Sequence, residues 1–227
     1  MSLEAAKDQE ERARQRLLER VVAEVRETGQ TTGVYVLSDR VLQALRTVPR
    51  HCFVPSEQRD CAYADIPLPI GRGQTISQPF IVALMSELLA ANAEDVVLEI
   101  GTGSGYQSAV LTVLARQIYS LERIPELANA ATCRLQELGL HNISVRVGDG
   151  CLGWEEHAPF DRIIVTAAAG DVPEALLRQL KPGGRLVIPV GLPQRTQDLQ
   201  VIDKDGQGQI QVRSVLPVVF VPLIGSF

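Results

Sequence analysis

The chain has 227 residues, with 22 Lys plus Arg against 27 Asp plus Glu and a formal net charge of −5 at pH 7. This length suits one domain, or one domain with an appendage, and allows a large buried core. The acidic balance and the lack of a Lys/Arg cluster argue against a nucleic-acid partner, and no apolar run approaches the length of a membrane span.

At the start of the chain, residues 4–26 are rich in Glu, Arg and Ala and predict an amphipathic helix that docks on the domain, with Gly29 just past its end. Its apolar stripe consists of Leu17, Leu18, Val21, Val22 and Val25. Ser38 is placed to cap a second helix over residues 39–47, which Pro49 ends. We expect residues 1–33 to be a helical extension and residues 34–227 to form the main domain.

Residues 50–65 are predicted to be irregular or weakly helical. The next stretch, residues 66–79 (IPLPIGRGQTISQP), combines prolines and glycines and predicts a loop with little freedom. Ser77 stands where an N-cap would, before a helix that runs from Pro79 to about Ala91.

The run Val96–Ile100 has the length and composition of a strand buried on both faces of a parallel sheet. Three alternating glycines follow it, and then a helical pattern over residues 107–115. Strand, glycine turn and helix form the first crossover of a doubly wound α/β domain. The glycines let the chain turn sharply and let a ligand lie against the backbone.

Further strands are expected at residues 117–121, 143–147, 162–166, 185–189, 199–203 and 211–219, and helices at 125–138 and 173–180. This alternation predicts an α/β fold with a doubly wound, mainly parallel, seven-stranded sheet. The last strands form an antiparallel end, and helices precede the sheet.

The spacing of the glycines narrows the choice of ligand. A dinucleotide site needs G-x-G-x-x-G, whereas this loop is G-x-G-x-G, with Tyr106 at the position of the third required glycine. Glu99, two residues before Gly101, would place a negative charge beside the ligand, which favours a cationic group over a pyrophosphate. The pattern E-x-G-x-G-x-G resembles the nucleoside-binding loop of S-adenosylmethionine-dependent methyltransferases, which assigns Gly101, Thr102, Gly103, Ser104 and Gly105 to the cofactor.

Other candidate ligand contacts follow the later strands, because ligands in such sheets bind at the carboxyl ends of the strands. Glu122, about twenty residues past Gly101, can accept hydrogen bonds from ribose hydroxyls; the alternative is an ordinary solvent-facing glutamate. Asp149 and Gly150 could hold the adenine edge, or form a simple turn. The small side chains of residues 166–169 leave room for a substrate.

No metal site is expected, because His51, His141 and His157 are isolated from one another and from any cysteine pair. The four cysteines, Cys52, Cys61, Cys133 and Cys151, are widely spaced and suggest reduced thiols. The charged start of the chain lacks the apolar core of a signal peptide. We therefore expect a cytoplasmic protein with no membrane partner.

Several segments together resemble the protein-L-isoaspartate O-methyltransferase family over about residues 34–225. Besides the glycine loop, they are IPLPIGRGQTISQPFIVALMSELL (66–89), VGDG (147–150), APFDRIIVTAAA (158–169) and LKPGGRLVIPVG (180–191). The resemblance implies that a methyl group passes from S-adenosyl-L-methionine, leaving S-adenosyl-L-homocysteine, to the α-carboxylate of L-isoaspartyl residues in damaged proteins and peptides. It implies an active-site role for Ser77, which also contacts the cofactor, as do Gln74, Thr75 and Arg123. Substrate contacts are implied at Ile70, Gly71, Val165, Thr166, Ala167 and Ala168, in a protein that we expect to be a monomer.

This reaction fits the lack of a His or Cys nucleophile. An α-carboxylate is already ionised at pH 7 and needs no general base, so catalysis should come from positioning and exclusion of water. We interpret Ser77 as a hydrogen-bonding residue that orients the substrate carboxylate; a plain helix cap is the alternative. Two other functions remain open: methyl transfer to a small metabolite or RNA, and a non-catalytic module that binds S-adenosylmethionine and scaffolds a partner through its N-terminal helix.

Overall fold

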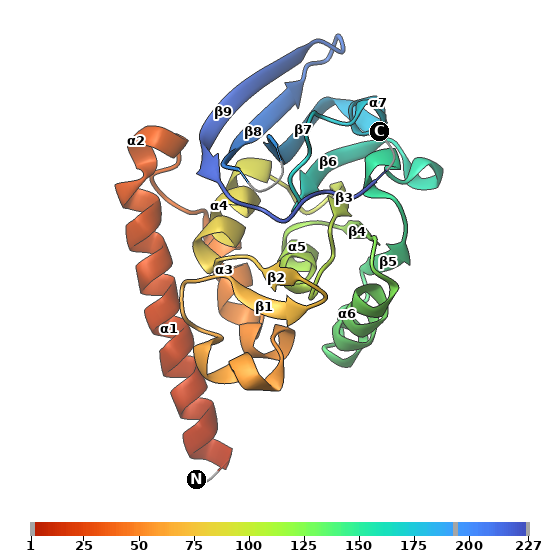
Figure 1. The fold of residues 1–227 in the computed structure, drawn as a ribbon. Helices are drawn as coiled ribbons and strands as arrows, with labels where there is room; N and C mark the ends of the chain where they lie inside the picture. Colours follow the sequence, from red (N-terminus) through yellow and green to blue (C-terminus); the bar gives the residue numbers. More distant parts are fainter. Residues whose placement is uncertain (1–2, 193–194, 226–227) are drawn as a thin grey trace.

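The computed structural model describes residues 3–192 and 195–225 and centres on a seven-stranded sheet in the order β5-β4-β3-β6-β7-β8-β9 (Figure 1). The strands are β3 (Val96–Ile100), β4 (Gln117–Glu122), β5 (Ile143–Val147), β6 (Phe160–Val165), β7 (Leu180–Val190), β8 (Gln197–Lys204) and β9 (Ile210–Val218). β3 to β7 pair in parallel, whereas β8 and β9 are antiparallel. The predicted doubly wound sheet with an antiparallel end is confirmed.

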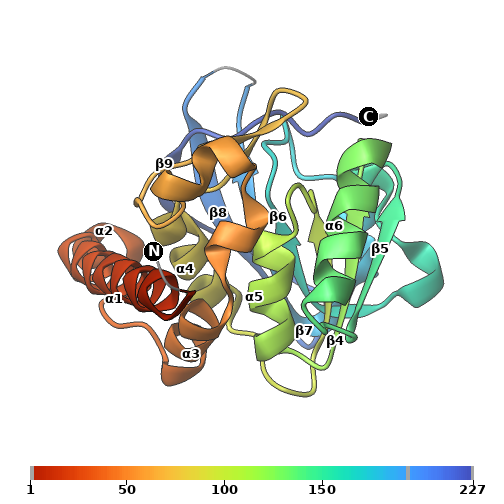
Figure 2. The ribbon, with the colours of Figure 1, turned by 90° about the horizontal axis from the view of Figure 1, so that it is seen from below.

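Helices cover one face of this sheet in two layers. α4 (Pro79–Leu89), α5 (Tyr106–Leu114) and α6 (Pro125–Glu137) lie against the strands, and α1 (Leu3–Glu27) and α3 (Asp39–Thr47) pack outside α4 and α5 (Figure 2). α7 (Glu174–Gln179) and the short 3-10 turns η3 (Gly150–Leu152) and η4 (Glu155–His157) belong to the opposite face. Each face of the sheet has its own apolar core. Because strand side chains alternate, Val97 points into the core on the side of α4, α5 and α6, whereas Leu98 and Ile100 point into the core on the side of α7.

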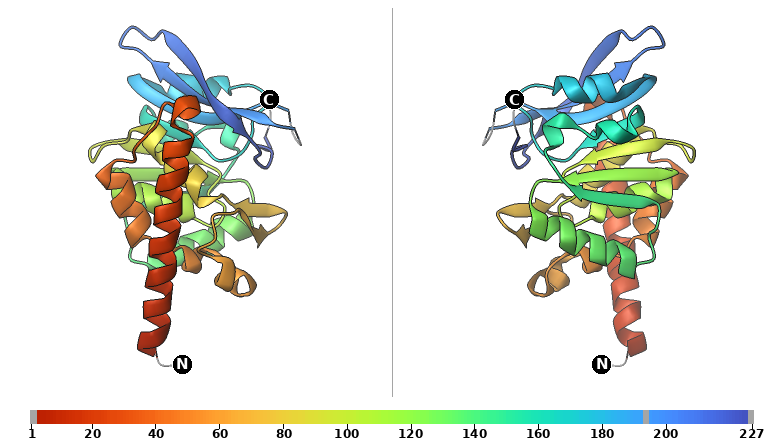
Figure 3. Two further views of the ribbon diagram at one scale, coloured as in Figure 1. Left: turned by 90° about the vertical axis from the view of Figure 1, so that its left-hand side faces the viewer. Right: turned by 90° about the vertical axis from the view of Figure 1, so that its right-hand side faces the viewer.

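The N-terminal helix belongs to the same core as the rest of the domain. Leu17, Leu18, Val21 and Val25 are buried as predicted, but Val22 is 44% exposed. α1 ends at Glu27, so Gly29 lies just past its end as predicted. Gly29 also begins a further short helix, α2 (Gly29–Thr32), and a Cβ there would collide with the ring of Tyr35. The left-handed stop is Gly33, with φ +74°. Figure 3 shows α1 running along one side of the molecule and the β8–β9 ribbon projecting past the other strands. None of the helices in the described residues is both long and apolar enough to span a bilayer.

The segment before α4 differs from its prediction. Two 3-10 turns, η1 (Arg50–Phe53) and η2 (Ser56–Cys61), lead to a hairpin of β1 (Leu68–Gly71) and β2 (Gln74–Ile76). Gly71, Arg72 and Gly73 all have positive φ, so they make the tight reversal that the hairpin needs. The predicted loop over residues 66–79 is therefore wrong in its centre.

Ser77 is not the cap of α4, contrary to the prediction. Gln78 occupies the N-cap position without a side-chain cap, and the amide of Phe80 donates instead to Asp65 Oδ1 at 2.9 Å. A carboxylate from a distant part of the chain thus satisfies the helix start. Local capping preference cannot reveal such a tertiary contact.

Candidate active site

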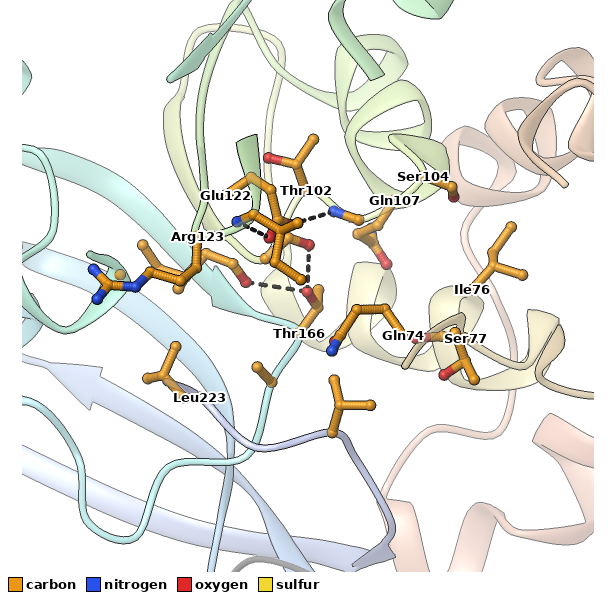
Figure 4. A pocket seen from close by; sticks show the side chains of 18 of the residues that line it. Gln74, Ile76, Ser77, Thr102, Ser104, Gln107, Glu122, Arg123, Thr166 and Leu223 are labelled. Atoms are coloured by element: carbon orange, nitrogen blue, oxygen red, sulfur yellow. Dashed lines mark hydrogen bonds between the residues drawn. The ribbon is translucent and has the colours of Figure 1, made fainter. Parts of the chain in front are cut away.

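A cavity opens at the carboxyl ends of β3, β4 and β6, where the order of the strands reverses and ligands bind in doubly wound sheets (Figure 4). Most of its wall comes from the end of the hairpin, the glycine loop, the end of β4, the loop after β6, and the C-terminal residues 221–224. Val82 of α4, Tyr106 and Gln107 at the start of α5, and Gly150 complete it. Of the predicted cofactor contacts, those that line it are Gln74, Thr75, Ser77, Gly101, Thr102, Gly103, Ser104, Glu122, Arg123 and Gly150.

The glycine loop is held down by the strands on both sides. The amide of Gly101 donates to the carbonyl of Leu121 at 2.8 Å, and Thr166 Oγ1 donates to the carbonyl of Gly101 at 2.6 Å. Gly101 has φ +97°, and a Cβ there would collide with Thr166 Oγ1. Only glycine suits this position, because it tolerates both the positive φ and the close approach.

Glu122 binds the loop directly. Its side chain is 7% exposed, Oε2 accepts from the amide of Gly103 at 2.8 Å, and Oε1 accepts from the amide of Ile124 at 2.9 Å (Figure 4). A carboxylate offers about four acceptor sites, so two remain for a ligand in the cavity. The alternative of a solvent-facing glutamate is excluded, and the geometry suits a pair of ribose hydroxyls.

Glu99 does not lie beside the cavity as expected. Its side chain is fully buried behind the glycine loop, and Oε2 accepts from the hydroxyls of Ser108 and Ser120, the latter at 2.6 Å. Thr102 Oγ1 lies 2.6 Å from Ser120 Oγ, so the network reaches the loop from behind. Burial raises the pKa of Glu99 to about 7, although the two hydroxyls favour the ionised form. Side chains alternate along β3, and that alternation points this carboxyl at α5 instead of at the ligand.

Two further predicted contacts lie behind the lining. Gly105 is the N-cap of α5, where a Cβ would touch Ala131 and Leu135 of α6. Asp149 accepts from the amide of Cys151 at 2.9 Å and lies 3.9 Å from Arg123, while Gly225 packs closely against it. Both residues support the wall from outside, whereas their neighbours Ser104 and Gly150 face the cavity.

The backbone of Ser77 is fixed while its hydroxyl is available. A fully buried arginine, Arg50, donates to the carbonyls of Ala62 at 3.0 Å and Ser77 at 2.9 Å. Its guanidinium also lies over the ring of Tyr106, 4.8 Å from the centroid. Within residues 3–192 and 195–225, the Ser77 hydroxyl has no protein hydrogen-bond partner, so it can bind a ligand.

A second cavity adjoins the first and shares four residues with it: Thr75, Ser77, Thr166 and Val221. Its other walls come from the ends of α1 and α4 and from residues 216–220 after and within β9. Of the predicted substrate contacts, Thr166 and Ala167 line the first cavity. Ile70 lies over Gly103, Gly71 is at the exposed hairpin turn, and Val165 and Ala168 are buried beside the lining.

The C-terminal part of the wall was missed from the sequence. The amide of Ala168 donates to the carbonyl of Val221 at 2.8 Å, and the amide of Leu223 donates to that of Ala168 at 2.7 Å. These bonds hold residues 221–224 beside the loop after β6, where they line the cavity; Leu223 is labelled in Figure 4. No motif marks this segment, because its contribution is mostly backbone and apolar surface.

The lining fits a nucleoside. Glu122 and Arg123 are the charged residues among the described lining residues, and Leu121, Ile124 and Leu223 supply apolar surface beside the carboxylate. A Cβ on Gly150 would collide with Ile100, so a glycine here lets the chain pack closely against the end of β3 and form the floor of the cavity. An apolar slot with a diol acceptor at one end suits an adenine base and its ribose. The described residues contain no group of three His, Cys, Asp or Glu side chains able to hold a metal ion.

Comparisons with known proteins agree with this geometry. The family described as "Protein-L-isoaspartate(D-aspartate) O-methyltransferase (PCMT)" matches residues 19–226, so the match begins within α1 and earlier than residue 34. A protein-L-isoaspartate O-methyltransferase 2 of Syntrophobacter fumaroxidans is 52% identical over 222 residues, 98% of this chain and 90% of that protein. One of the same name from Polaromonas sp. is 53% identical over 92% of this chain and 100% of its own length.

Solved structures give the same result for the fold. A protein-L-isoaspartate O-methyltransferase superimposes with a TM-score of 0.79 at 29% identity, covering 92% of this chain and 66% of that chain. A protein from Plasmodium falciparum, described as a putative protein-L-isoaspartate O-methyltransferase in complex with S-adenosyl-L-homocysteine, gives a TM-score of 0.76 at 24% identity. That alignment covers 96% of this chain and 99% of the other.

Proposed function

The chain belongs to the protein-L-isoaspartate(D-aspartate) O-methyltransferase family, and we propose that its two adjoining cavities hold the two substrates of the family's reaction. The enzyme transfers a methyl group from S-adenosyl-L-methionine to the α-carboxylate of L-isoaspartyl residues in damaged proteins and peptides. The observation that carries the proposal is the junction at Thr75, Ser77, Thr166 and Val221, which line both cavities. There, two ligands can meet.

The first cavity is the proposed cofactor site. Glu122 accepts hydrogen bonds from the ribose, the backbone of residues 101–104 surrounds the ligand, and Gln74, Thr75 and Arg123 flank it. Glu99, Gly105 and Asp149 act from behind by fixing the loop and the floor. When bound, S-adenosylmethionine supplies the electrophilic methyl group on its sulfonium.

The second cavity is the proposed peptide groove. In an isoaspartyl linkage the main chain runs through the side-chain carboxyl, so the α-carboxylate stands on a short branch. We assign the unpartnered hydroxyl of Ser77 to that carboxylate, with Thr166 and Ala167 beside it. Ile70, which lies over Gly103, and Gly71, at the exposed hairpin turn, are proposed as further contacts of the peptide outside the lining of the groove. Val165 and Ala168 position the loop after β6. A misplacement near 1 Å can cost about a hundredfold in rate, so the normal aspartyl carboxylate should react poorly.

The test offers one short peptide in its isoaspartyl and aspartyl forms, together with RNA and free amino acids, to the enzyme with labelled cofactor. We expect label almost only on the isoaspartyl form. The ester should then lose methanol without enzyme as the neighbouring backbone nitrogen closes a succinimide. Equal labelling of both isomers, or label only on RNA or a metabolite, would favour another acceptor. Cofactor binding with no transfer at all would favour a non-catalytic module.

We further propose that the protein acts as a cytoplasmic monomer without a nucleic-acid partner. Its four cysteines are unpaired, which suits a reducing compartment, and its net charge is −5. We also propose that residues 1–33 extend the domain of residues 34–227 and complete the groove, since Glu24 and Thr28 contribute to its wall. Sedimentation at several concentrations tests the monomer.

A further inference from the structure

The peptide groove has one charged corner. Most of its walls are apolar side chains from α4 and the end of β9, among them Phe80, Ile81 and Val219, the last of which is 78% exposed. Glu24, on α1, is the charged residue among the described residues of the wall. A lone carboxyl at the end of an apolar groove suits a ligand that carries a cation on an aliphatic stem.

Among the residues that the structure describes, none forms an ion pair with the carboxyl of Glu24. Gln78 Nε2 donates to Glu24 Oε1 at 3.4 Å, and the neighbour on its other side is a second carboxyl, Asp65. Asp65 is 7% exposed; its Oδ1 caps α4, whereas its buried Oδ2 meets no donor unless Glu24 carries a proton. Two other charged groups, Arg20 and Glu27, lie one turn away on α1 and line an adjacent hollow with Asp65. The buried guanidinium of Arg50 also acts on Asp65 through its charge.

We propose that Glu24, with Asp65 behind it, forms a subsite for a cationic group next to the isoaspartyl residue: a lysine or arginine side chain, or a free α-amino group. The inference rests on the proposed function, because it names a preference among isoaspartyl substrates. A bound ammonium would donate to the carboxyl of Glu24, with Asp65 behind it, while its stem would lie on the apolar wall.

The pair of carboxyls predicts a pH signature. Burial, and then the neighbouring Asp65, raises the pKa of Glu24 to about 7. Below that pH the Glu24 carboxyl carries a proton, and an incoming cation must displace it. Above that pH the corner carries the charge that attracts the cation. The preference for a basic neighbour should therefore grow from pH 6 to pH 8, a range in which lysine stays protonated.

The experiment compares isoaspartyl peptides that carry lysine or norleucine at a single position. This position is one or two residues before, or one or two residues after, the isoaspartyl residue. Norleucine keeps the stem and removes the charge. We expect lysine to raise kcat/KM about two- to fivefold at one of these positions at pH 8, as for a half-exposed ion pair, and less at pH 6. In Glu24→Gln the lysine-to-norleucine ratio should fall to about 1. Glu27→Gln, with the same loss of charge on the same helix, should keep it.

No lysine preference at any position, or a preference that survives in Glu24→Gln, would overturn the subsite. An equal fall of the lysine-to-norleucine ratio in Glu27→Gln would also overturn the subsite, because the overall negative charge of this part of α1 would then explain the preference. Calorimetric titration of the same peptides into enzyme saturated with S-adenosyl-L-homocysteine reads the preference without turnover. A total lack of methyl transfer would thus count against the proposed function, while calorimetry would still decide the subsite.

Discussion

Removing the carboxylate of Glu122 should weaken cofactor binding at least tenfold. In the structure this group already accepts from the amides of Gly103 and Ile124 at 2.8 and 2.9 Å and keeps two acceptor sites for the ribose. A hydrogen bond to a charged group contributes about 1.5–3 kcal/mol, and each 1.4 kcal/mol is tenfold in affinity. Loss of one ribose bond therefore suffices for the predicted effect, and Glu122→Ala loses both.

The variant also loosens the glycine loop, and the assay must separate the two effects. Calorimetry should compare adenosine with 2′-deoxyadenosine in wild type and in Glu122→Gln. If the carboxylate binds the diol, removing the 2′-hydroxyl should weaken binding in wild type far more than in the variant. Glu137→Gln, at the exposed end of α6, removes the same charge away from the cavity and serves as control. Equal sensitivity to the hydroxyl in both proteins would refute the assignment.

Two other predictions follow from groups whose surroundings differ from expectation. Ser77→Ala should lower kcat/KM for an isoaspartyl peptide more than it weakens cofactor affinity. Its free energy of unfolding should change by less than about 0.5 kcal/mol, because Asp65 caps α4; a loss of cap size, about 1 kcal/mol, would contradict this. Since folding raises the pKa of Glu99 from 4.5 to about 7, the folded state binds the extra proton, and stability is lost as pH rises through this window. Between pH 5 and pH 8, urea unfolding should show wild type losing up to about 3 kcal/mol relative to Glu99→Gln; parallel pH profiles would refute the shift.

The parts of the fold that local sequence determines were predictable. The apolar run of β3 and the glycines after it specify a strand, a turn and a helix in consecutive residues, and the structure has all three. Ser38 caps α3 as predicted because cap and helix are adjacent in sequence. The place where the order of the strands reverses, and with it the position of the site, follows from this alternation of strands and helices.

Features that depend on distant segments were not predictable in the same way. Asp65 takes over the cap of α4 from far upstream, which leaves Ser77 available for a ligand. The hydrogen bonds that satisfy the buried carboxyl of Glu99 come from two serines, Ser108 and Ser120, on separate elements. Residues 221–224 reach the cavity only through backbone bonds to Ala168, which no side-chain pattern reveals.

The charge distribution around the junction explains how this site can work without a base. Transfer of a methyl group from a sulfonium to a carboxylate joins opposite charges and leaves neutral products, so water, which stabilises the separated ions, slows the reaction. The residues shared by the two cavities, Thr75, Ser77, Thr166 and Val221, are uncharged. Glu122 and Arg123 lie in the cofactor cavity, and Glu24 lies in the peptide groove. The charges proposed to bind the two ligands thus lie outside the junction, and a junction without charged side chains favours the transition state over the separated ions.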